Sequence, residues 1–124
     1  MNFGRDLRKN PRVGPILIRA DFQQDGSRPR EGYLTNLSAG GAFLATENPP
    51  AIGSKLALRI LMPWKIGEIQ VSATVVWSTN GAGERARHLP GGVGVSFVEV
   101  PAAVEEKLHF YMRRFCELAA QIED

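Results

Sequence analysis

The chain has 124 residues, of which 44% are hydrophobic and 23% are charged, and its formal net charge is +2. This length suits one domain with a modest core, and the composition is that of a globular protein. A single cysteine excludes an internal disulfide and a cysteine-ligated metal cluster, and the small net charge argues against bulk nucleic-acid binding. The sequence has no apolar leader and no run of about 18 apolar residues, so we expect a cytoplasmic protein without membrane insertion.

Alternation of apolar and polar residues predicts five or six strands. The first covers residues 16–22, and the others cover residues 32–37, 42–46, 55–62, 69–77 and 93–100. The run over residues 69–77 is the longest, and we expect Trp77 to end its core-facing series. Residues 79–91 are rich in glycine and charge without periodicity, which predicts a flexible loop.

After Pro101 the apolar residues recur at steps of three and four, which predicts an amphipathic helix over about residues 101–122. We place Pro101 at the first helical position, and Glu105 and Glu106 in the first turn suit the helix dipole. Short strands with frequent turns followed by one helix predict a mainly β fold, a small antiparallel barrel with the helix against its side or mouth.

Residues for catalysis and metal binding do not cluster in this sequence. His88 and His109 have no ligand partners at a suitable spacing, and the carboxylates do not form a pair suited to acid and base catalysis. Cys116 falls on the apolar face of the helix, where burial raises a thiol pKa, so we expect it to be inert. We therefore expect a protein that is not an enzyme and that needs no cofactor and no metal.

Two short patterns are candidates for a binding site. They are Arg8-Lys9-Asn10-Pro11-Arg12, before the first strand, and Asn36-Leu37-Ser38-Ala39-Gly40-Gly41, between the second and third. Because 11 of the 15 basic residues are arginine, the first spacing should occur roughly once by chance, whereas the second should occur only about one time in twenty. Taken alone, the first pattern also fits a solvent-exposed basic segment that precedes a strand, and the second also fits a turn closed by glycines.

Together with Gly92-Val93-Gly94-Val95-Ser96-Phe97 in the last strand, these patterns resemble the PilZ family of bacterial cyclic di-GMP receptors. The resemblance runs from about Arg5 to Val100. It implies a six-stranded antiparallel barrel with a helix near one end, with ligand bound where the N-terminal arginine segment folds over the outer surface. We accordingly divide the chain into a flexible segment, residues 1–12, and a barrel with its helix, residues 13–124, in one domain overall.

The resemblance also implies which residues bind cyclic di-GMP. The matching positions are Arg8, Arg12, Asn36, Ser38 and Gly41, and auxiliary contacts are expected from Arg5, Lys9, Gly40 and Gly94. Many relatives carry a second arginine where this chain has Lys9, so the number of bound ligand molecules stays open.

The chemistry of these residues suits a ligand with two phosphates and two guanines. A guanidinium grips a phosphate or the guanine O6/N7 edge with two parallel hydrogen bonds, and it also stacks on a purine. Pro11 stiffens the segment between Arg8 and Arg12, which lowers the entropy lost on binding. The Asn36 amide can donate and accept, and the Ser38 hydroxyl can serve a phosphate or the turn itself. We expect Gly40 and Gly41 to adopt positive φ and to allow close approach of the ligand.

Our leading hypothesis is a cyclic di-GMP receptor that signals by changing its contacts with an unidentified effector protein, and a homodimer stays open. The alternative is an adaptor that binds no nucleotide and meets a partner through the helix face of Tyr111, Phe115 and Leu118. A single-stranded nucleic-acid binder is a third class, which the charge of +2 and the few aromatic residues disfavour. Trp64, in the turn before residue 69, fits either an exposed contact or a lid over the barrel end.

Overall fold

The structure is a computed structural model that describes residues 16–79 and 91–123. The predicted arginine segment and nearly all of the predicted 79–91 loop, with His88, lie outside the described residues. Six strands and one helix follow one another: β1 (Ile18–Gln24), β2 (Arg30–Leu37), β3 (Gly41–Ala45), β4 (Lys55–Met62), β5 (Gly67–Ser78), β6 (Gly92–Val98) and α1 (Ala102–Glu123). These bounds confirm the predicted elements to within two residues at nearly every end.

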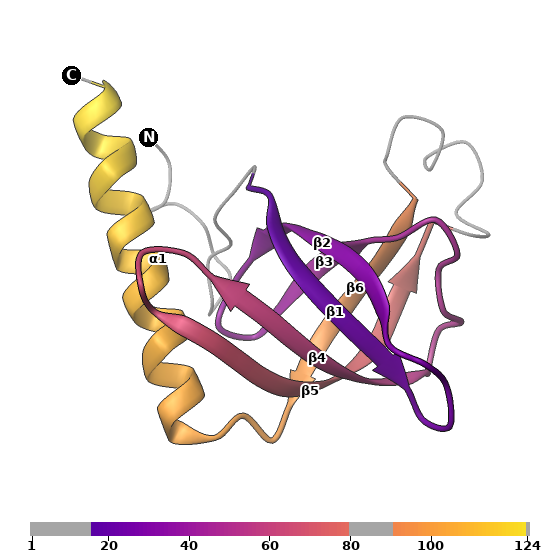
Figure 1. Ribbon diagram of the computed structural model, residues 1–124. Coiled ribbons are helices and arrows are strands. Elements are labelled where there is room, and N and C mark those ends of the chain that lie inside the picture. Colours follow the sequence, from indigo (N-terminus) through magenta and orange to yellow (C-terminus); the bar gives the residue numbers. More distant parts are fainter. Residues whose placement is uncertain (1–15, 80–90, 124) are drawn as a thin grey trace.

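The strands close into an antiparallel barrel in the order β1-β2-β3-β6-β5-β4 (Figure 1). Each strand pairs with a neighbour on both sides, so the barrel leaves no open sheet edge. Helix α1 runs along one side of the barrel, beside the turn that joins β4 to β5. The predicted mainly β class, with one C-terminal helix, is therefore confirmed.

Inward-facing side chains from every strand fill the core, and β4 illustrates how the sequence places them. Its residues alternate strictly between buried and exposed, with Leu58 only 2% exposed and Ile60 fully buried. Burying a side chain of this size contributes about 1.5–3 kcal/mol relative to leaving it exposed. Helix α1 adds Leu108 and Tyr111 to the same cluster, which fixes the helix against the barrel.

The alternation fails at the end of β5, where the placement of Trp77 in the core was wrong. Val75 pairs with Val95 and Trp77 pairs with Gly94, so the register shifts by one residue between them. This bulge turns both Val76 and Trp77 outward, and Trp77 is 39% exposed. Ser78 takes the buried position instead.

The β4–β5 turn presents Trp64 to the helix. Trp64 and Lys65 have φ angles of 58° and 63°, and the Ile66 N–H donates to the Pro63 carbonyl at 3.1 Å, as in a type I′ turn. The Trp64 and Tyr111 rings pack edge to face, with 4.9 Å between their centroids. Trp64 nevertheless remains 42% exposed. Trp64 is thus a helix contact that remains partly accessible.

The helix differs from the predictions in two details. Pro101 precedes the first helical residue, and its carbonyl accepts a hydrogen bond from the Glu105 N–H at 2.9 Å, so it caps the helix rather than beginning it. Tyr111 is 2% exposed and Phe115 packs against the core, so the face proposed for an adaptor points toward the barrel.

Candidate functional site

The turn between β2 and β3 is organised by the Ser38 hydroxyl. Ser38 Oγ accepts hydrogen bonds from the N–H groups of Gly40 (3.1 Å) and Gly41 (3.0 Å), and it lies 3.2 Å from the Gly41 carbonyl, to which it donates. The Ser38 N–H donates to the same carbonyl at 2.8 Å. Ser38 is only 4% exposed. Of the two roles considered for this hydroxyl, the structure uses it to hold the turn.

The glycines of this turn do not adopt the predicted backbone conformation. Neither Gly40 nor Gly41 is among the described residues with positive φ, so that expectation was wrong. A Cβ built on Gly41 would lie 2.2 Å from the Val95 carbonyl oxygen, because β3 and β6 approach closely there. The Phe97 N–H donates to the Gly40 carbonyl at 2.9 Å. Together these contacts fix the turn to β6.

Asn36 lies at the end of β2, next to this turn, and is half-buried. Its side-chain oxygen Oδ1 accepts a hydrogen bond from the Phe43 N–H at 3.1 Å, beside a register shift between Leu34 and Asn36. The amide orientation is therefore set by the backbone of β3. Within the described residues, this leaves the amide nitrogen as the donor available to a ligand.

Four residues line up across the outer surface of β2, β3, β6 and β5, and we call them the aromatic row: Asn36, Phe43, Gly94 and Trp77. Asn36 pairs with Phe43, Phe43 with Gly94, and Gly94 with Trp77. The rings of Phe43 and Trp77 lie 6.0 Å apart at 52° across the glycine, which has no side chain to separate them. The row therefore combines an amide with two apolar ring faces, the pair of features that a purine base needs.

The sequence interpretation missed both aromatic members of this row. Phe43 was detectable, because it stands between Ala42 and Leu44, which the alternation places in the core. Trp77 was not detectable by alternation, because the bulge reverses its direction.

The chain enters the barrel beside Asn36. The Ile16 N–H donates to the Thr35 carbonyl at 3.0 Å, which holds the start of the described chain against the end of β2. The four predicted cations, Arg5, Arg8, Lys9 and Arg12, lie outside the described residues. The described chain nevertheless begins next to the aromatic row, at Ile16.

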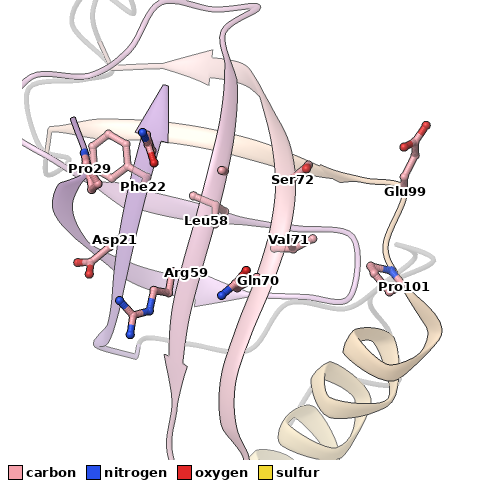
Figure 2. Close-up of a pocket in the computed structure, with 12 residues that line it drawn as sticks. Asp21, Phe22, Pro29, Leu58, Arg59, Gln70, Val71, Ser72, Glu99 and Pro101 are labelled. Carbon is pink, nitrogen blue, oxygen red and sulfur yellow. The ribbon is translucent and has the colours of Figure 1, made fainter. Parts of the chain in front are cut away.

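The opposite side of the barrel carries a groove of about 500 Å³ over β1, β4 and β5 (Figure 2). Three of its polar side chains, Asp21, Arg59 and Gln70, belong to a set that we call the polar ladder, which also includes Arg19, Glu31 and Glu68 beside the groove. Arg59 Nε lies 2.5 Å from Glu68 Oε1, and Arg19 lies 3.2 Å from Asp21 and 3.3 Å from Glu31. Hydrogen bonds from Gln70 and then Arg59 lower the pKa of Glu68. Because these charges satisfy one another, the groove has little to offer a dianionic ligand.

The described residues contain no cluster of histidine, cysteine and carboxylate side chains suited to a metal ion. His109 is 52% exposed and lies 3.5 Å from Glu105 on the helix surface. Burial raises the pKa of the Cys116 thiol, as predicted. Over residues 16–79 and 91–123, no helix has the length and apolar character needed to cross a bilayer.

The barrel and its N-terminal extension match a known family model, the PilZ domain, over residues 6–114. The chain belongs to the PilZ domain family. PilZ domains are ligand-binding receptor or adaptor domains rather than enzymes. No curated protein matches the chain by sequence.

Solved PilZ structures share the fold at low sequence identity. The PilZ domain of YcgR from Escherichia coli, solved with c-di-GMP, is 19% identical over 93% of this chain and 98% of that chain, with a TM-score of 0.67. The inhibitor of motility MotI/DgrA from Bacillus subtilis is 19% identical, covering 90% of this chain and 52% of that chain at a TM-score of 0.70. The MrkH–c-di-GMP complex of K. pneumonia is 14% identical, with 94% and 55% covered and a TM-score of 0.66. This chain thus spans about half the length of the Bacillus and K. pneumonia proteins.

Proposed function

We propose that this chain is a receptor for cyclic di-GMP, which it binds between its N-terminal arginine segment and the aromatic row, and that it has no enzymatic activity. The observation that carries the proposal is the hydrogen bond from the Ile16 N–H to Thr35, which anchors the arginine tether beside Asn36. Membership of the PilZ family and the c-di-GMP complexes of YcgR and MrkH support the same ligand.

The tether length brings Arg12 within reach of the row. Three residues separate Arg12 from Ile16, and the four extended steps between the two Cα atoms span at most about 14 Å. Chain length alone therefore limits how far the Arg12 Cα can lie from Ile16, whatever path the segment takes. Arg8 lies four residues further away, which suits a clamp on the two phosphates of one ligand.

Each residue then has a distinct role in binding. The guanidinium groups of Arg8 and Arg12 neutralise phosphate and face guanine, and the Asn36 amide nitrogen donates to a guanine edge. Trp77 and Phe43 supply the surface on which a purine lies. Ser38 and Gly41 act by holding the turn that positions Asn36, with Arg5, Lys9, Gly40 and Gly94 as auxiliary residues.

Ligand binding orders the arginine segment on the barrel and so changes the surface that an effector protein meets. The positive charges of the segment are covered by phosphate at the same time. Both changes alter what a partner can recognise without any movement of the barrel itself.

Calorimetric titration of cyclic di-GMP into the parent and into Arg8→Ala and Arg12→Ala tests the proposal. Each variant should lose about 1.5–3 kcal/mol of binding free energy, because each removes a charged hydrogen-bond donor. Arg28→Ala removes an exposed arginine from the β1–β2 turn and should leave binding unchanged. A parent titration that stays flat to about 1 mM ligand would contradict the proposal and favour an adaptor that binds no nucleotide.

A further inference from the structure

The surface between α1 and the β4–β5 turn has no role in the proposed nucleotide site. It forms a groove of about 870 Å³, lined by the tip of the turn and the outward face of the helix. Two large aromatic side chains remain accessible there, Phe110 at 47% exposed and Trp64 at 42%. Isolated apolar residues are common on surfaces, but two aromatic residues beside one groove are typical of contact sites.

The charges around Phe110 form a specific pattern. Glu105 lies 3.5 Å from His109, and Arg114 lies 3.7 Å from Glu117, so these side chains have partners on the helix itself. Glu106 and Arg113 are exposed and take part in no ion pair within the described parts of the chain. They stand four residues before and three residues after Phe110. We call these three residues, Glu106, Phe110 and Arg113, the Phe110 face.

We propose that a second copy of this chain docks on the Phe110 face, with the two α1 helices antiparallel about a twofold axis near Phe110. Glu106 and Arg113 are separated by about 10.5 Å along the helix, given a rise of about 1.5 Å per residue. Reversing one helix about Phe110 places Glu106 of each copy opposite Arg113 of the other. A twofold interface requires such self-complementarity, because each surface meets its own copy.

The charge pattern of this face suits a second copy. The Phe110 face carries one acid and one base, Glu106 and Arg113, that take part in no ion pair within the described parts of the chain. Of the two lysines that also line the groove, Lys107 donates to the Glu68 carbonyl at 3.5 Å, and Lys65 is exposed on the turn. When one helix is reversed, Glu106 of each copy lies opposite Arg113 of the other, so this face is complementary to itself.

The groove also offers a place for the partner's aromatic side chain. Phe110 of the second copy can enter beside Trp64, whose ring is already held by its contact with Tyr111. The two positive φ values at Trp64 and Lys65 fix the direction of the turn. A side chain ordered before association loses little entropy on binding, which favours contact at this point.

Sedimentation velocity of the full chain, without nucleotide and from about 1 μM to about 1 mM, tests for the dimer. We expect a concentration-dependent dimer, because one helix face and one turn make a small interface. Phe110→Asp should raise the dissociation constant at least about tenfold. Ile52→Asp, a matched change at a residue 63% exposed in the β3–β4 connection, should not. A chain that stays monomeric throughout, or a dimer that Phe110→Asp leaves intact, overturns the proposal.

Charge reversal tests the antiparallel arrangement itself. Glu106→Arg alone and Arg113→Glu alone each create two repulsive pairs in a twofold dimer, so each variant should dissociate more readily than the parent. Mixing the two variants should restore association, because both pairs in the mixed dimer are attractive. Circular dichroism should show each variant folded. If the mixture associates no better than either variant alone, the paired arrangement is wrong.

Discussion

The two outer sides of the barrel differ in the charge of the side chains that they expose. The polar ladder on β1, β4 and β5 and the neighbouring part of β2 carries charged side chains that pair with one another across neighbouring strands. The aromatic row on β2, β3, β6 and β5 carries an amide, two rings and a glycine, and has no charge of its own. A charged surface whose groups are already paired is therefore a weaker candidate for an anionic ligand than the uncharged row, which lies next to Ile16, where the described chain begins.

We therefore propose separate roles in binding for the barrel and for the N-terminal arginine segment. Exposed ion pairs contribute little to stability and little attraction for a ligand. In the proposed receptor, the row offers two apolar ring faces, and the arginine segment supplies the charge when it folds onto them. Four measurements test this division, and those with the greatest expected change come first.

The largest effect is expected from Gly41→Ala. The added methyl group would sit 2.2 Å from the Val95 carbonyl oxygen, so β3 and β6 must separate, at a cost of about 2–4 kcal/mol in the free energy of unfolding. Urea unfolding measures this loss. Gly94→Ala is the control on the row, because its Cβ would lie 3.5 Å from Trp77 Cβ, an ordinary contact. Equal losses in the two variants would contradict a packing role specific to Gly41.

Ser38→Ala should have the next largest effect on stability, about 1–3 kcal/mol. The change removes the acceptor for the N–H groups of Gly40 and Gly41 and leaves them without a side-chain partner. Urea unfolding again provides the measurement. Ser72→Ala, at an exposed serine in the groove on the polar-ladder side, should leave the unfolding midpoint unchanged.

Trp77→Ala should weaken cyclic di-GMP binding by about 1–3 kcal/mol, since it removes a stacking surface. Trp64→Ala makes the same change at a tryptophan of similar exposure that contacts Tyr111 instead. That variant should lose stability but bind within about twofold of the parent. Calorimetry on both separates the two roles, and equal binding losses would argue against a specific contact at Trp77.

The smallest effect is expected from Arg59→Ala on the polar ladder, which should leave nucleotide affinity within about twofold of the parent. Its effect should appear instead in acid. The pKa of Glu68 is lowered below its ordinary 4.5 in the folded chain, so this group adds stability above its unfolded pKa and loses it as pH falls through the folded value. Removing Arg59 should therefore make the free energy of unfolding fall slightly less steeply as the pH is lowered from about 6 to about 3. A large loss of affinity would place the ligand on this side of the barrel.

Much of the fold followed from local patterns in the sequence. Strict alternation in residues 55–62 predicted β4 and its buried face, and the change of period after Pro101 predicted α1. The direction of Trp77 could not be predicted in this way, because a single inserted residue reverses every later side chain of a strand. The Asn36 and Ser38 pattern predicted a site near the β2–β3 turn, but the partners of both side chains depend on β3.

The sequence alone predicted five or six strands in their order along the chain, the terminal helix and the two patterns that resemble the PilZ family. These properties depend on periodicity and on neighbours along the chain. The outward direction of Trp77 and the requirement for Gly41 depend on contacts between strands. Pairing with β6 shifts the register of β5 before Trp77, and β6 brings Val95 against Gly41 from more than fifty positions away. No local pattern encodes either contact, whereas the Ser38 hydroxyl bonds only the nearby Gly40 and Gly41.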